Sequence, residues 1–407
     1  MRVLTFTSLF PNAIQPLHGV FVYQRTAHFA KLRGNHVQVV APIPYVPRSL
    51  RLPRWRALSQ VPAQERVGEL DVYHPRYPLV PKLSMPLHGL LMFLGSLRRV
   101  VQLHKASRFD CIDAHYIYPD CFAAVLLGRV LGLPVMVSAR GTDINLFPSF
   151  RLIRPLIRWT LREAAGTVAV STALKQAMLN LNISELDVKV IGNGVDLEKF
   201  QPVERIAARQ VLGLREDAQL IVSVGSLILP KGHQLLISAF AQVMTKFCNL
   251  MLYIVGEGRH RRELEELIAN LGLRDRVFLV GNKPNEELRF WYSAADMSCL
   301  VSSREGWPNV LLESLSCGTP VLATRVGGVP EIISSPKLGV LVEQDCPSIA
   351  AGLEFCLKKH WDREALVQHA RARTWYVVAS EVQNFFDSIL LRDRARRRAS
   401  LEISLDV

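Results

Sequence analysis

Residues 298–332 read SCLVSSREGWPNVLLESLSCGTPVLATRVGGVPEI and alternate apolar segments with glycine-containing loops. The apolar run that ends near Leu300–Val301 predicts a buried strand, and Pro320–Thr324 predicts a second one. Between them we expect a helix of about two turns, because the apolar residues stop at Gly318 and glycine commonly follows a helix end. Pro330 is typical of the first turn of another helix. The stretch therefore predicts strand, loop, helix, strand, loop, helix, which is an α/β pattern.

Two glutamates in this stretch, Glu305 and Glu313, are separated by seven residues. In an open parallel sheet the ligand crevice lies at the carboxyl ends of the strands, where helix starts offer free N–H groups to a diphosphate. Gly306 and Gly327-Gly328 would let the backbone approach such a ligand. The two carboxylates could hold a ribose and a hexose through their hydroxyls. An isolated pair with this spacing is more often one turn residue and one solvated helix residue, so the neighbouring sequence decides.

The run EGWPNVLLESLSCGTPVLAT resembles the signature of the family-four retaining glycosyltransferases, which have the GT-B architecture. The resemblance implies two doubly wound, Rossmann-like α/β domains that face each other across a cleft. It also implies that Glu305 contacts the donor sugar, that Glu313 binds the ribose hydroxyls, and that the backbone of residues 306–309 touches sugar and phosphate. The full set of expected donor-binding residues is Gly225, Ser226, Lys231, Gly256, Gly281, Glu305, Gly306, Trp307, Pro308, Asn309, Val310 and Glu313.

Lys231 lies in the loop GSLILPKG, between a predicted strand, Leu220–Val224, and a predicted helix that begins at His233. A lysine beside the free N–H groups of a helix start is well placed to bind a diphosphate as a point charge, although a solvated loop lysine is the simpler alternative. Members of the family often carry an arginine five residues before this lysine, and Ser226 stands there instead. Either another basic group supplies the second charge, or phosphate binding is weaker.

His115 and Asp143 each follow closely on a predicted strand of the first half, Phe109–Ala114 and Pro134–Ala139. Residues at the carboxyl ends of strands in one sheet would face the same crevice. A lone histidine is usually structural, but the family pattern has a histidine and a G-[ST]-D at matching places. The resemblance implies that His115 contacts the donor sugar, that Asp143 orders the site or the acceptor, and that Gly19 borders the acceptor. The expected catalytic residues are His115, Lys231 and Glu305.

At 407 residues the chain is long enough for two domains. By the resemblance, residues 1–197 are expected to form an N-terminal, acceptor-binding domain and residues 198–375 a nucleotide-sugar-binding domain. Residues 376–407 are expected to form a C-terminal helix that crosses back to the first domain, followed by a basic tail that is solvated or disordered. Residues 43–81 are rich in proline and arginine and predict an irregular loop region.

The formal charge is +13, from 49 basic and 36 acidic residues, and favours anionic partners without choosing among them. A predicted helix at Leu83–Lys105 is apolar in its first half and basic in its second. It is either a membrane-docking helix or a packed helix with a solvated end. Four arginines lie on one face of another predicted helix, which is either a face for phosphate or lipid head groups or a solvated face. They are Arg151, Arg154, Arg158 and Arg162.

Several absences limit the possible chemistry. The seven cysteines are widely spaced without a C-x-x-C pair, which favours reduced thiols in a cytosolic protein over metal binding or disulfides. The apolar start of the chain is too short for a signal peptide. No apolar run reaches the roughly 20 residues of a membrane span. No D-x-D sequence occurs, so neither a metal nor another cofactor is expected. The predicted location is the cytoplasm, with the inner face of the plasma membrane as an option.

These features together predict a nucleotide-sugar-dependent hexosyltransferase of cell-surface polysaccharide synthesis. It would move a sugar to a hydroxyl of a glycan or polyprenyl-linked acceptor, with retention at the anomeric carbon; retention comes from the resemblance alone. Within the family, the chain looks most like bacterial enzymes of exopolysaccharide or teichuronic acid synthesis. Two alternatives stay open, a nucleotide-sugar epimerase of the same fold and an inactive nucleotide-sugar-binding regulator. No nucleic-acid partner is expected, and a dehydrogenase is disfavoured by the missing G-x-G-x-x-G.

Overall fold

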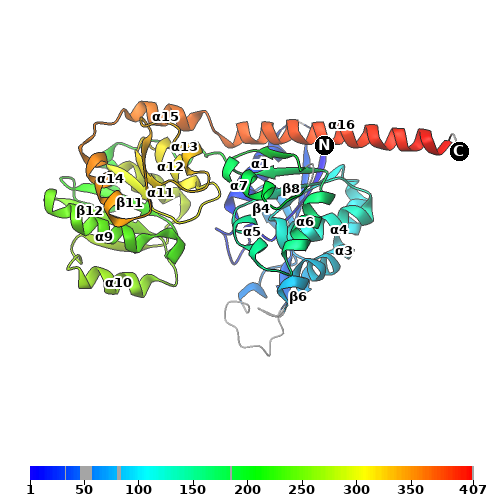
Figure 1. The fold of residues 1–407 in the computed structure, drawn as a ribbon, viewed down its shortest axis with the longest axis horizontal. Coiled ribbons are helices and arrows are strands. Elements are labelled where there is room, and N and C mark those ends of the chain that lie inside the picture. The colour runs from blue at the N-terminus through cyan, green and yellow to red at the C-terminus, as the bar shows by residue number, and fades with distance from the viewer. Residues whose placement is uncertain (33, 46–56, 80–83, 184–185, 406–407) are drawn as a thin grey trace. The chain divides into compact units, whose positions relative to one another are not determined.

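The computed structural model describes residues 1–32, 34–45, 57–79, 84–183 and 186–405, which form two compact units (Figure 1). The first unit comprises Met1–Asn193 together with Trp375–Val407, and the second comprises Gly194–Thr374. Each unit contains its own twisted sheet with helices packed against it. This is the two-domain α/β architecture that the sequence predicts.

The first unit is built on an eight-stranded sheet of order β10-β9-β8-β7-β1-β2-β5-β4. All neighbouring strands are parallel except β4 and β5, which form an antiparallel edge. The central strands are almost fully buried, as expected for a parallel sheet covered on both faces. The strands are β1 (Arg2–Phe6), β2 (His36–Val40), β4 (Gln64–Val67), β5 (Leu70–Tyr73), β7 (Cys111–His115), β8 (Val135–Ala139), β9 (Gly166–Ala169) and β10 (Val188–Val190).

The C-terminal helix belongs to the first unit. Helix α16 (Trp375–Leu405) and helix α1 (Val20–Lys31) share one apolar cluster, in which the rings of Phe29 and Phe386 lie 5.5 Å apart. Helices α3 and α4 pack against each other, and α4 also contacts α6. The remaining helices of this unit are α3 (His88–Ser107), α4 (Phe122–Leu131), α5 (Thr142–Asn145), α6 (Arg154–Glu163) and α7 (Thr172–Leu179).

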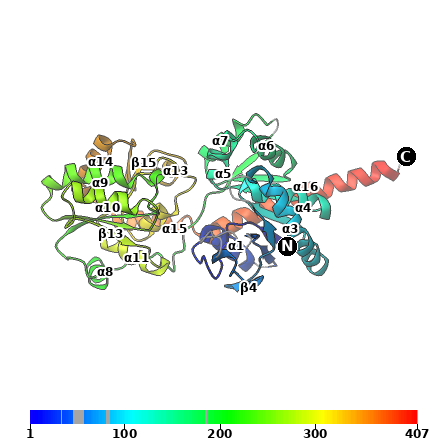
Figure 2. The ribbon, with the colours of Figure 1, turned by 90° about the horizontal axis from the view of Figure 1, so that it is seen from below.

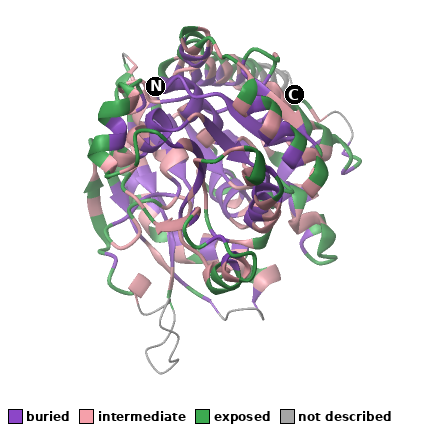
Figure 3. Cartoon of the chain, turned by 90° about the vertical axis from the view of Figure 1, so that its left-hand side faces the viewer, coloured by how far each residue is buried: buried purple, intermediate pink, exposed green. Residues whose placement is uncertain are grey.

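The second unit has a fully parallel six-stranded sheet of order β13-β12-β11-β14-β15-β16. One face is covered by α9, α10 and α14, and the other by α8, α11, α12 and α15 (Figure 2). The strands are the buried centre of the unit (Figure 3). They are β11 (Gln219–Val224), β12 (Leu250–Val255), β13 (Val277–Gly281), β14 (Met297–Leu300), β15 (Val321–Thr324) and β16 (Gly339–Val342).

Helices α9 to α13 each lie between two consecutive strands of the second unit, because parallel strands must be joined by crossover connections. Helix α12 occupies the place predicted for the two-turn helix after Glu305, and it ends before Gly318. The helices are α8 (Arg205–Leu212), α9 (His233–Val243), α10 (Arg261–Asn270), α11 (Asn285–Ala294), α12 (Asn309–Ser316), α13 (Val329–Ile332), α14 (Cys346–Lys358) and α15 (Arg363–Arg371).

Two local predictions are wrong. The stretch 43–81 was expected to be irregular, but its described part contains β4 and β5 as well as β3 (Ile43–Tyr45) and β6 (Arg76–Pro78), which pair with each other. Strands β3 and β6 pair with each other, and β5 pairs with β2, across about 30 residues, so local periodicity does not reveal them. Strand β4 pairs locally with β5, but both strands are too short to give a clear alternating pattern. The basic run after Leu391 was expected to be a solvated or disordered tail; of these alternatives only disorder is wrong, because α16 continues through the run while Arg392 and Arg394 are exposed. Arginine and alanine are strong helix formers and extend a helix that is already nucleated.

Candidate active site

The loops that carry the predicted donor residues meet where the strand order of the second sheet reverses. Strands β11 and β14 are neighbours, although β12 and β13 separate them in the sequence. The chain therefore leaves these two strands in opposite directions, and open α/β sheets bind ligands at such a point. The N–H of Ser303 donates to the carbonyl of Pro230 at 2.8 Å, which joins the two loops directly.

Lys231 and Glu305 form an ion pair at this point, with Nζ 2.7 Å from Oε1. The lysine side chain is 25% exposed and the glutamate 10%, so both can meet a ligand without being fully solvated. Lys231 comes just before α9, whose first turn has no side-chain cap. The free N–H groups and the ammonium both favour an anion. A diphosphate could replace Glu305 as the partner of the ammonium and leave the carboxylate to accept bonds from sugar hydroxyls.

Glu313 lies on α12, eight residues after Glu305, and its Oε2 accepts a hydrogen bond from the buried Tyr292 hydroxyl at 3.1 Å. Burial raises the pKa of Glu313 to about 7, and the hydrogen bond from Tyr292 partly opposes this shift. A strongly perturbed carboxyl beside a ligand crevice is a candidate functional group. This geometry is compatible with the predicted role of Glu313 in binding ribose hydroxyls, which stays a prediction.

The pKa of Glu313 gives a pH test of that role. An ionised carboxylate accepts stronger hydrogen bonds from hydroxyls than its protonated form does. We therefore expect the affinity for UDP to rise between pH 6 and pH 8, as Glu313 loses its proton. Calorimetric titration of wild-type protein and Glu313→Gln in the same buffers would check this. The variant removes the side-chain titration but keeps that of UDP, so equal pH profiles for the two proteins would refute the role.

Two glycines in these loops lie where no side chain fits. Gly327 has φ +52°, and a Cβ atom there would come within 1.9 Å of the carbonyl oxygen of Glu305. A Cβ at Gly256, with φ +154°, would come within 2.0 Å of the carbonyl oxygen of Gly225. At both positions the neighbouring protein backbone therefore comes too close for any residue except glycine. The sequence predicted close approach by a ligand at Gly327, whereas in the structure the carbonyl of Glu305 occupies this place. Gly281 accepts a bond from the N–H of Gly256 at 2.9 Å.

The segment between the two glutamates leads into α12. Gly306 accepts a hydrogen bond from the N–H of Gly328 at 3.1 Å, so the two glycine loops are connected. Pro308 precedes α12 and Asn309 is its first residue. Trp307 and Val310 are half-buried and pack against the core cluster of this unit. The structure thus brings residues 305–313 together with Lys231, whereas their contacts to a donor stay predictions.

Ser226 is exposed and brings no positive charge to the Lys231 loop. Its carbonyl accepts a hydrogen bond from the N–H of Ile228 at 2.9 Å. Ser226 therefore has the backbone contact of a residue in a turn. A serine hydroxyl can donate one hydrogen bond to a phosphate but cannot replace the charge of an arginine.

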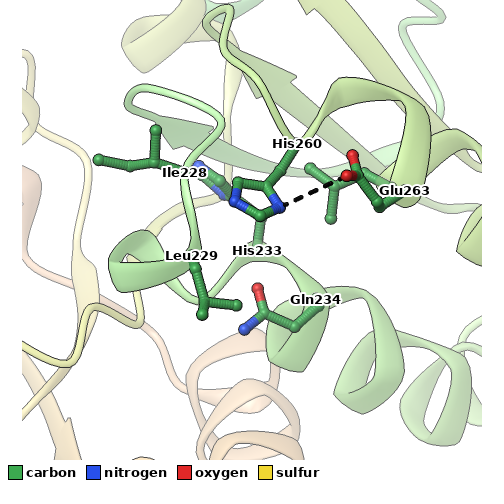
Figure 4. Close-up of a pocket in the computed structure, with 7 residues that line it drawn as sticks. Ile228, Leu229, His233, Gln234, His260 and Glu263 are labelled. Atoms are coloured by element: carbon green, nitrogen blue, oxygen red, sulfur yellow. Dashed lines mark ion pairs between the residues drawn. The ribbon is translucent and has the colours of Figure 1, made fainter.

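His233 lies beside this loop but was not predicted as a site residue. Its Nε2 is 3.9 Å from the position that a Cβ on Gly225 would take. It also lines a cavity of about 170 Å³ between the starts of α9 and α10 (Figure 4). Burial, followed by the charge of Lys231, lowers the pKa of His233 to about 4, so its imidazole is neutral near pH 7. The other lining residues are Ile228, Leu229, Gln234, His260, Glu263 and Leu264.

The first unit has its own reversal of strand order, between β1 and β7. Asp120 joins the segments that follow these strands, because it accepts hydrogen bonds from the N–H of Ser8 at 2.6 Å and from the hydroxyl of Thr7 at 3.3 Å. Burial raises the pKa of Asp120 to about 7. Gly19, predicted beside the acceptor, precedes α1 with φ +65°, and a Cβ there would lie 2.3 Å from the carbonyl oxygen of Leu9.

His115 ends β7 and is completely buried. Its Nε2 lies 3.2 Å from Oδ2 of Asp113, and its Nδ1 contacts the guanidinium groups of Arg25, at 3.3 Å, and of Arg140. Desolvation lowers the pKa of His115 to about 3, so the ring is neutral. Both ring nitrogens face protein groups, and the contact of His115 with a donor sugar stays a prediction.

Asp143 lies in the predicted G-T-D segment after β8 and is also buried. It accepts hydrogen bonds from the backbone N–H groups of Ile117 at 2.8 Å, Gly141 at 2.7 Å and Arg140 at 3.1 Å. These bonds stabilise the loop after β7 and the loop after β8. An ordering role for Asp143 fits this geometry better than direct contact with an acceptor. The sequence analysis missed Arg25, Asp113, Asp120 and Arg140, which it treated as ordinary helix, strand and loop residues.

Neither metal ligands nor membrane-spanning helices are found in the part of the chain that the structure describes. No group of three or more His, Cys, Asp or Glu residues among the described residues has a geometry that could hold a metal ion. No described helix combines the length and apolarity needed to cross a membrane.

Two adjoining family models match the chain. Residues 18–199 match "Glycosyltransferase Family 4" and residues 204–373 match "Glycosyl transferases group 1". A D-inositol 3-phosphate glycosyltransferase of Streptosporangium roseum is 34% identical over 72% of this chain and 73% of its own length. A putative teichuronic acid biosynthesis glycosyltransferase of Bacillus subtilis is 28% identical over 87% of this chain and 88% of its own.

A solved structure of the Anabaena protein HepE, in complex with UDP and glucose, superposes with a TM-score of 0.70. It is 19% identical, and the match covers 95% of this chain and 100% of that one. The two Rossmann-like units thus have the fold of GT-B glycosyltransferases. The chain belongs to the glycosyltransferase family defined by the family 4 and group 1 domains, and it is a transferase enzyme, which confirms the resemblance and the fold predicted from the sequence.

Proposed function

We propose that the protein transfers a sugar from a nucleotide-sugar donor to a hydroxyl of a glycan or lipid-linked acceptor, with retention at the anomeric carbon. The observation that carries the proposal is the Lys231–Glu305 pair at the β11–β14 switch point, with Glu313 on the following helix. An ammonium beside a helix start suits a diphosphate, and two carboxylates suit sugar hydroxyls. The UDP and glucose bound to the Anabaena protein support this donor class.

In the proposed reaction the acceptor hydroxyl attacks the anomeric carbon while the bond from that carbon to the diphosphate breaks. Negative charge develops on the departing phosphate oxygen, where Lys231 and the N–H groups at the start of α9 can stabilise it. We propose that this cation and these dipoles serve without a metal ion. We propose that the hydroxyl attacks from the same face that the diphosphate leaves, so the configuration is retained without a covalent enzyme intermediate. The hydroxyl proton passes to the departing diphosphate.

The name of the Bacillus subtilis relative supports cell-surface polysaccharide synthesis as the setting, and that of the Streptosporangium relative supports a hydroxylated acceptor. A thermal-shift panel of UDP-, GDP- and ADP-sugars identifies the donor, and mass analysis with polyprenyl-linked acceptors identifies the product. Proton NMR of the product reports whether the anomeric configuration is retained. Inversion, or failure of all donors to bind, would refute the proposal.

An inactive nucleotide-sugar-binding regulator is a second candidate, and the exposed Ser226 is the observation that favours it. Such a protein would bind a donor without turning it over in the presence of any acceptor. An epimerase of the same fold would instead release nucleoside diphosphate or isomerise the sugar without an acceptor. Diphosphate release that depends on the acceptor excludes both.

We further propose that the first unit contacts the anionic cytoplasmic face of a membrane. Residues 1–193 contain 23 Lys and Arg against 10 Asp and Glu, whereas residues 194–374 contain 21 of each. The whole excess of 13 positive charges therefore belongs to residues 1–193. A charge asymmetry of this size between two halves of a chain suits an anionic surface.

Helix α3 supports the membrane proposal because it has two apolar faces. Met92, Val100 and Leu103 are buried, but two leucines of α3 and one that directly precedes it are exposed at helical spacing, and Arg98 continues their row. Exposed apolar side chains next to basic ones are typical of helices that lie at a bilayer surface. Arg98, Arg99 and Gln102 also line an open pocket of about 540 Å³ with Arg76. The exposed leucines are Leu87, Leu90 and Leu94, which are 54%, 42% and 57% exposed.

Helix α6 and the segment before it also combine exposed apolar side chains with exposed arginines. Leu152 is 70% exposed and Phe150 is 41% exposed, and Arg151, Arg154 and Arg162 are exposed as well. Arg158 differs, because it is half-buried and donates to the carbonyl of Asn182 at 3.0 Å. The predicted arginine row is thus divided between one structural member and three that face solvent.

Replacing Leu90 and Leu94 by glutamate should weaken binding to vesicles that contain phosphatidylglycerol by at least about tenfold, because each buried leucine contributes roughly 1.5–3 kcal/mol. Co-sedimentation of the full-length protein measures this. Val211→Glu is the matched control, because Val211 is 63% exposed on α8 in the second unit, whose formal net charge is zero. Binding that is equal for the wild type and the α3 variant would contradict the proposal, as would equal binding to neutral phosphatidylcholine vesicles.

A further inference from the structure

The charges at the carboxyl end of β7 and β8 include one half-buried cation, Arg140, whose hydrogen-bond partners are all neutral. Arg25 has an acidic partner, because its Nη2 lies 3.2 Å from Oδ1 of Asp113. Arg140 has none within ion-pair distance in the described part of the chain. Its side chain contacts Nδ1 of His115, Oδ1 of Asn193 at 3.3 Å and the face of the Phe21 ring.

The contacts of His115 fix its tautomer. A guanidinium group can only donate hydrogen bonds, so Nδ1, which faces Arg25 and Arg140, must be the nitrogen that carries the lone pair. The ring proton is then on Nε2, on the side of Asp113. His115 therefore presents a neutral acceptor to Arg140 and directs the guanidinium without neutralising its charge.

A cation that is partly withdrawn from water is costly unless an anion compensates it. Burial, followed by repulsion from Arg25, lowers the pKa of Arg140 to about 9, which still leaves the side chain charged near pH 7. The charges of Asp113 and Asp143 partly oppose this shift, although neither carboxylate forms an ion pair with Arg140. Asp143 accepts from backbone N–H groups, including that of Arg140, and does not contact the guanidinium in an ion pair. The charge of Arg140 is thus held in place by neutral groups and is available to a ligand.

Arg140 also has the position of a ligand-binding residue. It follows β8 directly, at the carboxyl edge of the sheet, and its side chain is only half-buried, in contrast to Arg25 and His115. Phe21, which its guanidinium covers at 5.5 Å, is in the first turn of α1, next to Gly19. This is the region to which the acceptor is assigned.

We propose that Arg140 binds an oxyanion of the acceptor, so that the acceptor is a hydroxylated compound bearing a phosphate or carboxylate group. The inference rests on the proposed function, in which the first unit holds the acceptor. The planar guanidinium can bind either oxyanion through two parallel hydrogen bonds. Arg140 is then the specificity residue for the acceptor, and His115 is the positioning residue that orients it.

Direct binding tests the proposal without requiring turnover. Full-length Lys231→Ala protein lacks the ammonium group proposed to bind the donor diphosphate. It is titrated by calorimetry with D-glucose 6-phosphate, D-glucuronate and D-glucose at constant ionic strength. We expect both anionic probes to bind and glucose to bind at least about tenfold more weakly. Binding of one anionic probe alone identifies the oxyanion as phosphate or carboxylate. The titration contains no donor, so it tests acceptor binding even if the protein has no glycosyltransferase activity.

Variants assign the effect to Arg140. Adding Arg140→Gln should remove the preference for the anionic probes, and Arg140→Lys should restore it in part, because the charge returns without the fork geometry. Arg129→Gln, which changes an arginine that is 56% exposed on the same unit, should have no effect. His115→Asn keeps an acceptor near the position of Nδ1 and should retain more affinity than His115→Ala. Equal affinity for glucose and both anionic probes would overturn the proposal, as would an unchanged preference in folded Arg140→Gln.

Discussion

Glu305→Gln should lower kcat/KM for sugar transfer by about two to three orders of magnitude while leaving the protein folded. Glutamine keeps the size of the side chain but loses the charge that strengthens hydrogen bonds from sugar hydroxyls. The free energy of unfolding should change by no more than about 1 kcal/mol, because the pair with Lys231 is partly exposed. Initial rates at saturating acceptor, together with thermal unfolding, measure both quantities.

The ion pair makes a second, opposite prediction for the same variant. In the wild-type protein a diphosphate must compete with Glu305 for the ammonium of Lys231, which lies 2.7 Å from the carboxylate. Removing the carboxylate charge should therefore leave the affinity for UDP unchanged or increase it, even though transfer is lost. Glu354→Gln is the matched control, because Glu354 also pairs with lysines in this unit, Lys246 and Lys358. Full turnover by Glu305→Gln would refute the assignment.

The sequence was sufficient for the parts of this site that depend on local order. Strand, loop and helix alternate around Glu305 because apolar runs, Gly318 and Pro330 impose them within a few residues. The α/β pattern also places the ligand crevice at the carboxyl ends of the strands, whereas the strand order, and with it the switch point, comes from the structure. Lys231 and Glu305 are 74 positions apart in the sequence, yet both could be assigned because each follows a recognisable strand.

The buried charges of the first unit could not be assigned in this way. Arg25 lies in the middle of an ordinary amphipathic helix and Asp113 lies inside a strand, and neither belongs to a motif. They are 88 positions apart, and only the packing of α1 against the sheet brings them together. Asp113 itself was the one sequence feature that indicated a buried ion pair, because a charged residue inside a buried strand almost always has a partner of opposite charge.

For His115 the sequence predicted the position at a strand end but not the side-chain contacts. The histidine does lie at the end of a parallel strand, as predicted. Its two ring nitrogens, however, face Asp113 and the two arginines. A sequence pattern gives the residue type that occupies a strand end, but the direction of its side chain depends on neighbours from α1 and β8.

Arg25→Leu should reduce the free energy of unfolding by about 3–5 kcal/mol at pH 8, which is the largest stability effect we expect from a single substitution here. The pair with Asp113 is almost completely buried, with side chains 4% and 7% exposed. Removing the arginine leaves a carboxylate in the core with less compensation than before. Arg129→Leu is the control, because the Arg129–Glu163 pair is 56% and 33% exposed and should contribute about 1 kcal/mol at most.

The pH dependence identifies the cause of the loss. In the wild-type protein Arg25 and His115 hold the pKa of Asp113 below its ordinary value, against the opposing effect of burial. This contribution to stability is therefore present above the unfolded pKa, near 3.9, and is lost only as the pH falls below it. In Arg25→Leu, burial should raise the pKa of Asp113, so the folded state takes up a proton and the deficit shrinks as the pH is lowered from 8 to 5. Urea unfolding at both pH values measures the deficit. The double variant Arg25→Leu, Asp113→Asn should recover part of the lost stability at pH 8, because it removes the uncompensated charge. If the loss of stability does not depend on pH and Asp113→Asn does not reduce it, then lost packing and not charge is responsible.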